Sequence, residues 1–179
     1  MTATLSRGET PFGSKPFARD DVAHRRWLAR AWQPDRGITR AQLLTHAQNR
    51  IAELTNPDAP GRALGWQPVH RVVAQLAMSL LEALVTGDDL ATPQVAPTPE
   101  GGINIEWLVS GDALSVTVDL EGLSIEAHLD NGEYAFAPRY WDYGADQEAL
   151  IRELRQVLPI ASRFLDKIST GIQHRLPLK

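Results

Sequence analysis

The sequence predicts an α+β protein in which a four-stranded antiparallel meander packs against helices, preceded by a helical N-terminal part. Three observations predict this class. Apolar residues recur at helical spacing between residues 39 and 84, polar and apolar residues alternate between residues 103 and 141, and a helical pattern returns after residue 146. Hydrophobic residues form 43% and charged residues 22% of the 179 residues, which is typical of a chain with a packed core.

Composition divides the chain into four segments. We expect an extended N-terminal arm over residues 1–19, a helical region over 20–87, a proline-rich linker over 88–100, and the sheet with its C-terminal helix over 101–179. The chain has no cysteine, which excludes disulfides, zinc–thiolate sites and cysteine nucleophiles. It also has no apolar run long enough to span a membrane and no apolar stretch of the signal-peptide kind near its start. We therefore expect a cytoplasmic protein that does not contact a membrane.

The helical region begins with two well-marked elements. Asp20 or Asp21 can cap a first helix that runs to about residue 33, where Pro34 stops it. The apolar residues at helical spacing in this helix are Val22, Trp27, Leu28 and Ala31. Thr39, followed three residues later by Gln42, forms a capping box that predicts the start of the second helix.

Two further helices follow. The third begins near Pro68, at the favoured first helical position, and Gly87 suits its C-cap. Its wide apolar face predicts the central core helix. The last helix begins near Asp146, and Pro159 is expected to kink it or to begin a second piece.

Four strands are predicted between residues 103 and 141, and the turns between them set the register. Glu121-Gly122 and Asn131-Gly132 are read as two-residue hairpin turns. They predict that one face is buried, with these residues opposite each other: Leu120 and Leu123, Val118 and Ile125, Val116 and Ala127, Leu129 and Tyr134, and Ala127 and Phe136.

The opposite face of the predicted sheet is polar. Glu106, Thr117 and Glu126 fall in one cross-strand row, with the two carboxylates about 10 Å apart. Carboxylates at such a separation could support inverting glycoside hydrolysis, and His128 near an acidic residue could bind a metal. The alternative, which the pattern favours, is that an exposed antiparallel face needs polar side chains for solubility.

Charge is segregated along the chain. Residues 1–74 carry 11 Lys/Arg against 6 Asp/Glu (net charge +5), residues 75–150 carry 1 against 14 (−13), and residues 151–179 carry 6 against 2 (+4). This layout favours a chain that neutralises itself, with basic helices near an acidic sheet. It could also present two faces of opposite sign to partners.

Two clusters are candidate interfaces. Arg25, Arg26 and Arg30 lie close to tryptophans in "HRRWLARAW" and could form a basic edge that binds nucleic acid, or simply the solvated face of an amphipathic helix. Three more arginines could extend this edge: Arg36, Arg40 and Arg50. Tyr140, Trp141 and Tyr143 lie at the end of the fourth predicted strand and could form either the edge of the core or an exposed anchor. Aromatic residues are enriched at protein–protein hot spots.

Catalytic and cofactor motifs are absent. The five histidines are scattered without metal-ligand spacing, and the sequence contains no phosphate-binding loop and no nucleophile-elbow motif. Gly101-Gly102 precedes a strand instead of a helix, so no helix N-terminus follows it to hold an anion. We expect no cofactor, no bound metal and no catalytic residue.

The run "PTPEGGINIEW" over residues 97–107 resembles a segment of small bacterial proteins without assigned biochemistry, Pro-x-Pro-[Asp/Glu]-Gly-Gly-[Ile/Val]-x-x-Glu-Trp. The resemblance covers residues 68–136. Some of those proteins occur in toxin–antitoxin-like or defence-type gene pairs, which implies a binding role instead of a catalytic one. The matching positions are implied to be structural: Pro97, Pro99, Gly101, Gly102, Glu106 and Trp107.

The leading hypothesis is a non-enzymatic protein-binding module, of the antitoxin, immunity or accessory-subunit kind, whose partner is another protein encoded nearby. Two alternatives stay open. One is a nucleic-acid-binding protein that uses the basic N-terminal helices, and the other is an enzyme that uses Glu106, Glu126 or His128 on the polar sheet face.

Overall fold

A computed structural model describes residues 37–57, 67–144 and 146–173. The predicted arm over residues 1–19 and the predicted helix over residues 20–33 lie outside the described residues. The described chain folds as an α+β structure, which confirms the predicted class.

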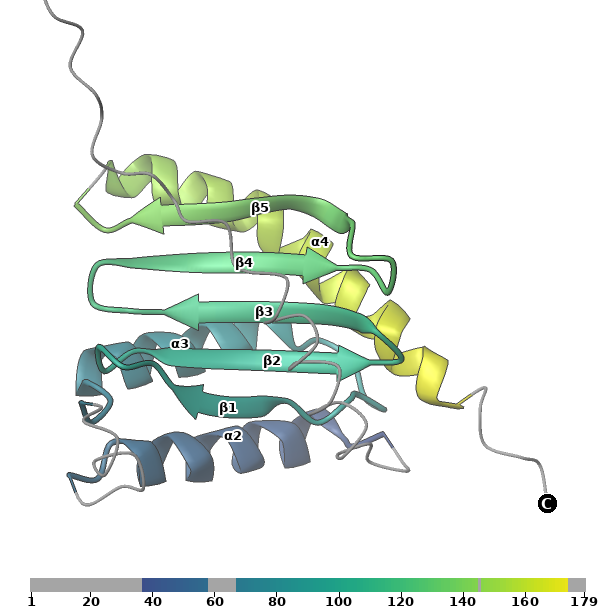
Figure 1. Ribbon diagram of the computed structural model, residues 1–179, viewed down its shortest axis with the longest axis horizontal. Coiled ribbons are helices and arrows are strands. Elements are labelled where there is room, and N and C mark those ends of the chain that lie inside the picture. The colour runs from purple at the N-terminus through teal and green to yellow at the C-terminus, as the bar shows by residue number, and fades with distance from the viewer. Residues whose placement is uncertain (1–36, 58–66, 145, 174–179) are drawn as a thin grey trace, which may run out of the picture.

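The sheet has five antiparallel strands in the order of the chain, so each strand pairs with its sequence neighbours (Figure 1). The strands are β1 (Gln94–Pro97), β2 (Ile103–Val109), β3 (Asp112–Val118), β4 (Gly122–His128) and β5 (Tyr134–Asp142).

The predicted count of four strands is wrong, because β1 forms inside the segment predicted to be a proline-rich linker. Proline lacks the N–H that a central strand needs, so a proline-rich segment argues against a strand in the middle of a sheet. β1 avoids this restriction because it is a four-residue edge strand, with Pro97 as its last residue.

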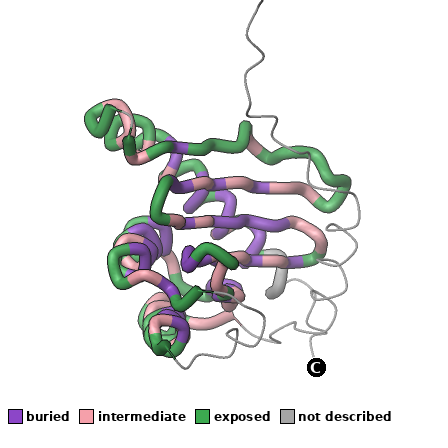
Figure 2. The backbone as a smooth tube through the Cα atoms, turned by 60° about the vertical axis from the view of Figure 1, so that its left-hand side comes forward, coloured by how far each residue is buried: buried purple, intermediate pink, exposed green. Residues whose placement is uncertain are grey.

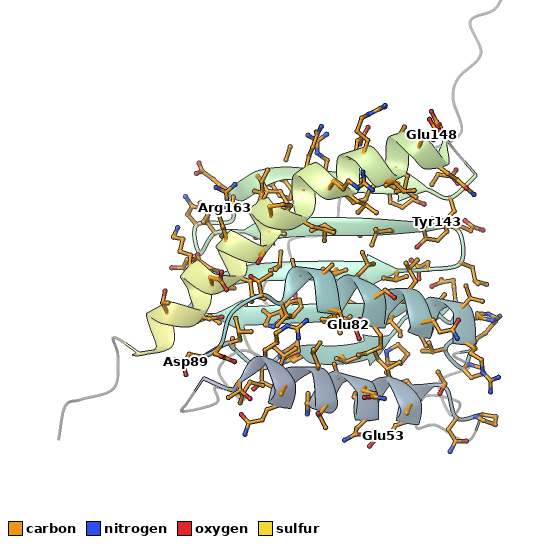
Figure 3. The ribbon with its side chains drawn as sticks, turned by 180° about the vertical axis from the view of Figure 1, so that it is seen from behind. Glu53, Glu82, Asp89, Tyr143, Glu148 and Arg163 are labelled. Atoms are coloured by element: carbon orange, nitrogen blue, oxygen red, sulfur yellow. The ribbon has the colours of Figure 1, made fainter. Side chains whose placement is uncertain are left out.

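Three described helices pack on one face of the sheet: α2 (Arg40–Leu54), α3 (Arg71–Leu84) and α4 (Gln147–Gln173). Figure 3, seen from behind, shows all three in front of the strands, with α4 running diagonally across them. α4 contacts β2, β3 and β4, while α2 lies against α3 and β1. The described part of the chain therefore forms two layers, with helices behind the sheet and no described helix in front of it (Figure 1).

The core lies between these layers, and the alternation along the strands decides which side chains enter it. In β2 every second residue is buried, and Ile103, Ile105 and Trp107 are each 0% exposed. Figure 2 shows this alternation along the central strands, whereas β5 is exposed along most of its length. Burying a large apolar side chain stabilises the fold by about 1.5–3 kcal/mol, so the inward face of the sheet is a major source of stability.

The ends of the helices agree with the sequence prediction only in part. The capping box of α2 is confirmed, since the Thr39 side chain accepts from the Gln42 backbone and the Gln42 side chain accepts from the Thr39 backbone. The predicted C-cap of α3 at Gly87 is wrong, because the helix ends at a C-cap at Val85. α4 continues through Pro159 as one helix instead of being divided there.

Arg40 connects the start of α2 to the end of α3. Its guanidinium donates to the carbonyl oxygens of Val85, at 2.7 Å, and of Glu82, at 3.1 Å. The last carbonyls of a helix have no hydrogen-bond partner within the helix and carry partial negative charge. A guanidinium at this end therefore supplies both the missing donors and a favourable positive charge. The Arg40 backbone N–H in turn donates to Asp88 at 2.9 Å.

The register between β3 and β4 differs from the prediction by two residues. Val118 pairs with Leu123, and a turn over residues 119–121 replaces the predicted two-residue turn. Leu120 therefore lies in the turn and is 52% exposed, so its predicted burial is wrong. Because side chains alternate with a period of two, an even shift leaves each strand residue on its predicted face.

The hairpin between β4 and β5 contains an irregularity in register that the sequence pattern does not predict. Ala127 pairs with Phe136, as predicted from the Asn131-Gly132 turn. The register then shifts on both sides of Ala127, and Tyr134 pairs with His128 instead of lying opposite Leu129. A β-bulge inserts one extra residue into a strand and re-aims the side chains beside it. Tyr134 is thereby placed on the outward face, contrary to the prediction.

The segment "PTPEGGINIEW" forms the hairpin between β1 and β2. The Thr98 N–H donates to the Gly102 carbonyl at 2.9 Å, and the Gly102 N–H donates to the Thr98 hydroxyl at 2.9 Å. The Gly101 carbonyl accepts from the backbone N–H of His70, the N-cap of α3, at 3.1 Å. Gly101 therefore lets this turn approach the N-terminal end of α3, because a Cβ there would lie 2.9 Å from the His70 ring and 2.9 Å from the Pro68 carbonyl oxygen.

Gly102 gives a direct test of how the β1–β2 turn packs against the end of β3. A Cβ at this position would lie 2.7 Å from the Thr98 hydroxyl and 2.7 Å from the Val118 carbonyl oxygen, and would overlap the Asp119 carboxylate. We predict that Gly102→Ala lowers the free energy of unfolding by about 1–3 kcal/mol, the usual cost of overpacking. Urea unfolding followed by far-UV circular dichroism measures this change.

Gly144→Ala is the matched control, because its nearest neighbour is the Asp142 carboxylate of a flexible side chain, at 3.2 Å. We expect this control to change stability by less than about 0.5 kcal/mol. Equal effects of the two substitutions would contradict the packing described for the β1–β2 turn.

Candidate functional site on the open sheet face

The open sheet face is the side of the sheet that the three described helices do not cover. Its side chains form cross-strand rows, because residues that pair across antiparallel strands point to the same side. One row contains Gln94, Glu106, Ser115 and Glu126, from β1 to β4. A second row contains Ala96, Asn104, Thr117, Ser124 and Tyr140, from β1 to β5.

An amide at the centre of this face organises the polar side chains of β3. The Oδ1 atom of Asn104 accepts from the Ser115 hydroxyl at 2.8 Å and from the Thr117 hydroxyl at 3.1 Å. Both hydroxyls are thus committed to a hydrogen bond within the sheet. This arrangement fixes the side chains and gives no sign of a hydroxyl prepared to act as a nucleophile, since neither contacts a histidine base.

The two candidate carboxylates share a row, as the sequence predicts, although the residue between them differs. Glu106 pairs with Ser115, and Ser115 pairs with Glu126, so Ser115 takes the place predicted for Thr117. The carboxylates belong to β2 and β4, two strand spacings apart, or about 10 Å. The β2–β3 and β3–β4 pairings both differ from the prediction by two residues. The two carboxylates therefore stay in one row despite the error in register.

His128 lies beside Glu126 on the same strand and completes a small cluster. Its Nε2 atom is 3.3 Å from the Glu126 carboxylate, and its ring lies 4.5 Å from the ring of Tyr134, centroid to centroid. Within the described ranges, no three His, Asp or Glu side chains come together in a way that could hold a metal ion. The cluster therefore has the character of a polar and aromatic contact surface.

The three aromatic residues predicted at the end of β5 have different environments. Tyr140 is 68% exposed on the open sheet face, and its ring lies over Gly122, where a Cβ would come within 2.7 Å of the tyrosine hydroxyl. Trp141 is 7% exposed, and its indole N–H donates to Glu153 of α4 at 3.0 Å. It thus attaches the helix layer to β5, so its ring is not exposed on the described surface.

Tyr143 is half-buried after the end of β5, where its backbone N–H donates to the Glu121 carbonyl at 3.0 Å. Burial raises the pKa of its phenol to about 12, and the nearby Asp119 carboxylate and Tyr140 phenol add to the effect. All three causes disfavour the negative phenolate. Figure 3 shows Tyr143 at one end of the sheet, on the helix side.

Arg25, Arg26 and Arg30, the predicted basic edge, lie outside the described residues. Two arginines predicted to extend that edge are engaged within the fold. Arg40 binds the end of α3, and Arg50 forms an ion pair with Glu53 at 2.7 Å. The described part of the chain therefore does not present them as a continuous basic strip for a nucleic-acid backbone.

Sequence reasoning missed Asn104 and Tyr134 as residues of this face. Asn104 occupies an outward position between Ile103 and Ile105, and the alternation alone could have placed it there. Tyr134 carried no such signal, because its place depends on the bulge near Ala127.

No helix within the described ranges has the length and apolarity needed to cross a membrane. Comparison of the chain with models of known protein families, with curated proteins and with solved structures found no match.

The titration of Tyr143 tests its environment. Because its pKa is raised above the ordinary value of 10.0, the neutral phenol is the form that the fold favours. Its contribution to stability is fully present below pH 10 and is lost as the pH rises through about 12. We predict that Tyr143→Phe removes the ionisation step near pH 12 from an ultraviolet titration of tyrosinate at 295 nm.

The control is Tyr134→Phe, since Tyr134 is 52% exposed and contacts neither Asp119 nor Tyr143 in the described interactions. This variant should keep the step near pH 12. Loss of that step in the Tyr134 variant instead of the Tyr143 variant would refute the assignment.

Proposed function

We propose that the protein is a non-enzymatic protein-binding module, of the antitoxin, immunity or accessory-subunit kind, that contacts its partner through β5. The observation that carries the proposal is the exposure of aromatic side chains along this edge strand. Seven of its nine residues are exposed, and Tyr134 and Tyr140 are 52% and 68% exposed. Tyrosine provides a large contact area together with a polar end, and it is enriched among residues that dominate binding energy.

β5 is suited to binding through side chains. An edge strand has backbone groups that can pair with another chain, but Pro138, in the middle of β5, has no N–H to donate. The bulge beside Ala127 further disturbs the regularity of this edge. These two features hinder the addition of a sixth strand, and a partner would then bind the tyrosines without extending the sheet.

The attachment of α4 supports β5 from behind. Trp141 is buried, and its hydrogen bond to Glu153 holds the end of β5 against α4. Phe136 packs edge to face on Phe164 of α4, with ring centroids 6.5 Å apart. Two inward aromatic side chains therefore hold the strand in place while its tyrosines point outward, and such pre-organisation reduces the entropy lost on binding.

Affinity purification of the tagged full-length protein from its source cells tests the proposal. We predict that a partner protein is recovered in a stoichiometric complex at about 0.15 M salt. The double variant Tyr134→Ala/Tyr140→Ala should lower its recovery at least tenfold, because loss of two hot-spot side chains costs more than about 1.4 kcal/mol of binding free energy.

Val72→Ala is the matched control, since Val72 is 69% exposed but lies on α3, in the helix layer. It should leave the recovery unchanged. A wild-type protein that is recovered alone as a monomer, or a partner retained equally by the tyrosine variant, would contradict the proposal.

A further inference from the structure

α4 carries more positive side chains than the other two described helices together. α2 and α3 contain three Lys/Arg between them, whereas α4 contains four, which are all exposed: Arg152, Arg155, Arg163 and Lys167. No ion pair joins any of the four to an acidic residue within the part of the chain that the structure describes. Their positive charge is therefore available to a ligand of opposite charge.

Three of these cations form one row along the helix, the α4 basic row: Arg152, Arg163 and Lys167. They are separated by 11 and 4 residues, or about three turns and about one turn, so they lie on the same side of the helix. The positions between them in this row are Gln156 and Pro159, which are exposed and uncharged. α4 continues through Pro159 as one helix, so the row is about 22 Å long. Figure 3 looks onto the helix layer and labels Arg163 on α4.

The acidic residues of α4 do not interrupt the row. Glu148 lies in the first turn, before the row begins, where a negative charge favours the helix N-terminus. Glu153 accepts the hydrogen bond from the Trp141 indole at 3.0 Å, which commits it to the contact with β5. Asp166 is only half-exposed, beside Gly87. The outward side of α4 is therefore cationic over the length of the row.

The acidic sheet does not oppose a negatively charged ligand on this side. Glu106 and Glu126, the two carboxylates in the middle of the sheet, belong to the open sheet face, which points away from the helices. The diameter of α4 with its side chains, about 10–12 Å, already exceeds the Debye length of about 8 Å at physiological salt. Solvent ions therefore screen a ligand on the outward side of α4 from these carboxylates.

The chemistry of the row matches a phosphodiester backbone. Two of its three members are arginines, whose guanidinium groups bind phosphate oxygens bidentately. A DNA duplex is a stiff ligand with one negative charge per about 1.7 Å of its axis, so it can follow a straight row of cations. We propose that the outward side of α4 binds the phosphate backbone of double-stranded DNA, without reading the base sequence. This inference does not depend on the partner proposed for β5, which contacts a different element.

The other side chains of α4 favour a duplex over a single strand or a lipid surface. Proteins bind single strands by stacking bases on aromatic side chains, but Phe164, the one aromatic residue of α4, is 8% exposed. A helix that lies in a membrane surface needs an apolar face. The exposed Ile151 and Ile160 are nine residues apart, which places them about half a turn from each other, on opposite flanks of the row.

Fluorescence anisotropy of a labelled DNA duplex of about 20 base pairs and arbitrary sequence, titrated with the full-length protein, tests the proposal. We predict a Kd in the micromolar range at about 0.05 M salt. Neutralising one phosphate with each of the four cations gives a slope of about −3.6 for the logarithm of the affinity against that of the salt concentration. Raising the salt to about 0.2 M should therefore weaken binding about 100-fold.

The variant Arg152→Gln/Arg163→Gln assigns the binding to the row. Glutamine has a helix propensity close to that of arginine, so α4 is expected to fold unchanged, which the thermal unfolding midpoint checks. We predict that affinity for the duplex at about 0.05 M salt falls at least tenfold and that the slope becomes shallower by about 1.8. Arg50→Gln/Arg71→Gln is the matched control, because it removes the same charge from α2 and α3. It should change the affinity less than threefold.

A wild-type protein that does not bind the duplex at about 0.05 M salt would overturn the proposal. Equal losses in the two double variants would also overturn it, since binding would then follow net charge instead of the α4 basic row. Two further results would assign the row to another ligand. One is tighter binding of the corresponding single strand, and the other is binding of phosphatidylserine vesicles in place of the duplex.

Discussion

The structure depends on the burial of one face of an antiparallel sheet. Trp107, Leu114 and Ile125, on three neighbouring strands, are each fully buried against the helices. Since side chains alternate along a strand, this burial determines which residues face the other way. The polar character of the open sheet face, its two carboxylates and its small central side chains all follow from the same alternation.

Polar contacts then orient the helices on this apolar layer. The Ala91 N–H donates to the buried hydroxyl of Ser169 at 3.0 Å, and the hydroxyls of Thr86 and Ser162 lie 2.9 Å apart. Both contacts join α4 to the segment after α3. Apolar burial alone is non-directional, so these directional bonds help to hold the diagonal path of α4 across the sheet. The same helix anchors Trp141 and thereby positions β5.

Some features of the fold were predictable because they depend on local chemistry. Thr39 and Gln42 form a capping box within four residues, and the alternation around Ile103 identifies the buried face of β2. Other features depend on distant partners. β1 forms a strand only because it pairs with β2 at the edge of the sheet. Tyr134 faces outward only because the register shifts beside Ala127.

In the candidate site, too, some residues could be placed from local sequence and others depend on distant contacts. The row of Glu106 and Glu126 was predictable, because an error of two residues in register does not change the face of a side chain. The burial of Trp141 was not, since its hydrogen bond joins it to a helix that begins after the sheet is complete. Aromatic residues at the end of a strand have the same sequence pattern whether they anchor a helix or meet a partner.

The buried face of the sheet and the exposure of β5 together support a protein that is stabilised on one side of its sheet and binds a partner through an edge strand. Urea unfolding of the Trp107→Ala variant tests this account most directly, because Trp107 is 0% exposed. The account predicts that the free energy of unfolding falls by about 3–5 kcal/mol, the usual cost of truncating a buried tryptophan. A fall of less than about 1 kcal/mol, the size of an ordinary substitution, would contradict it.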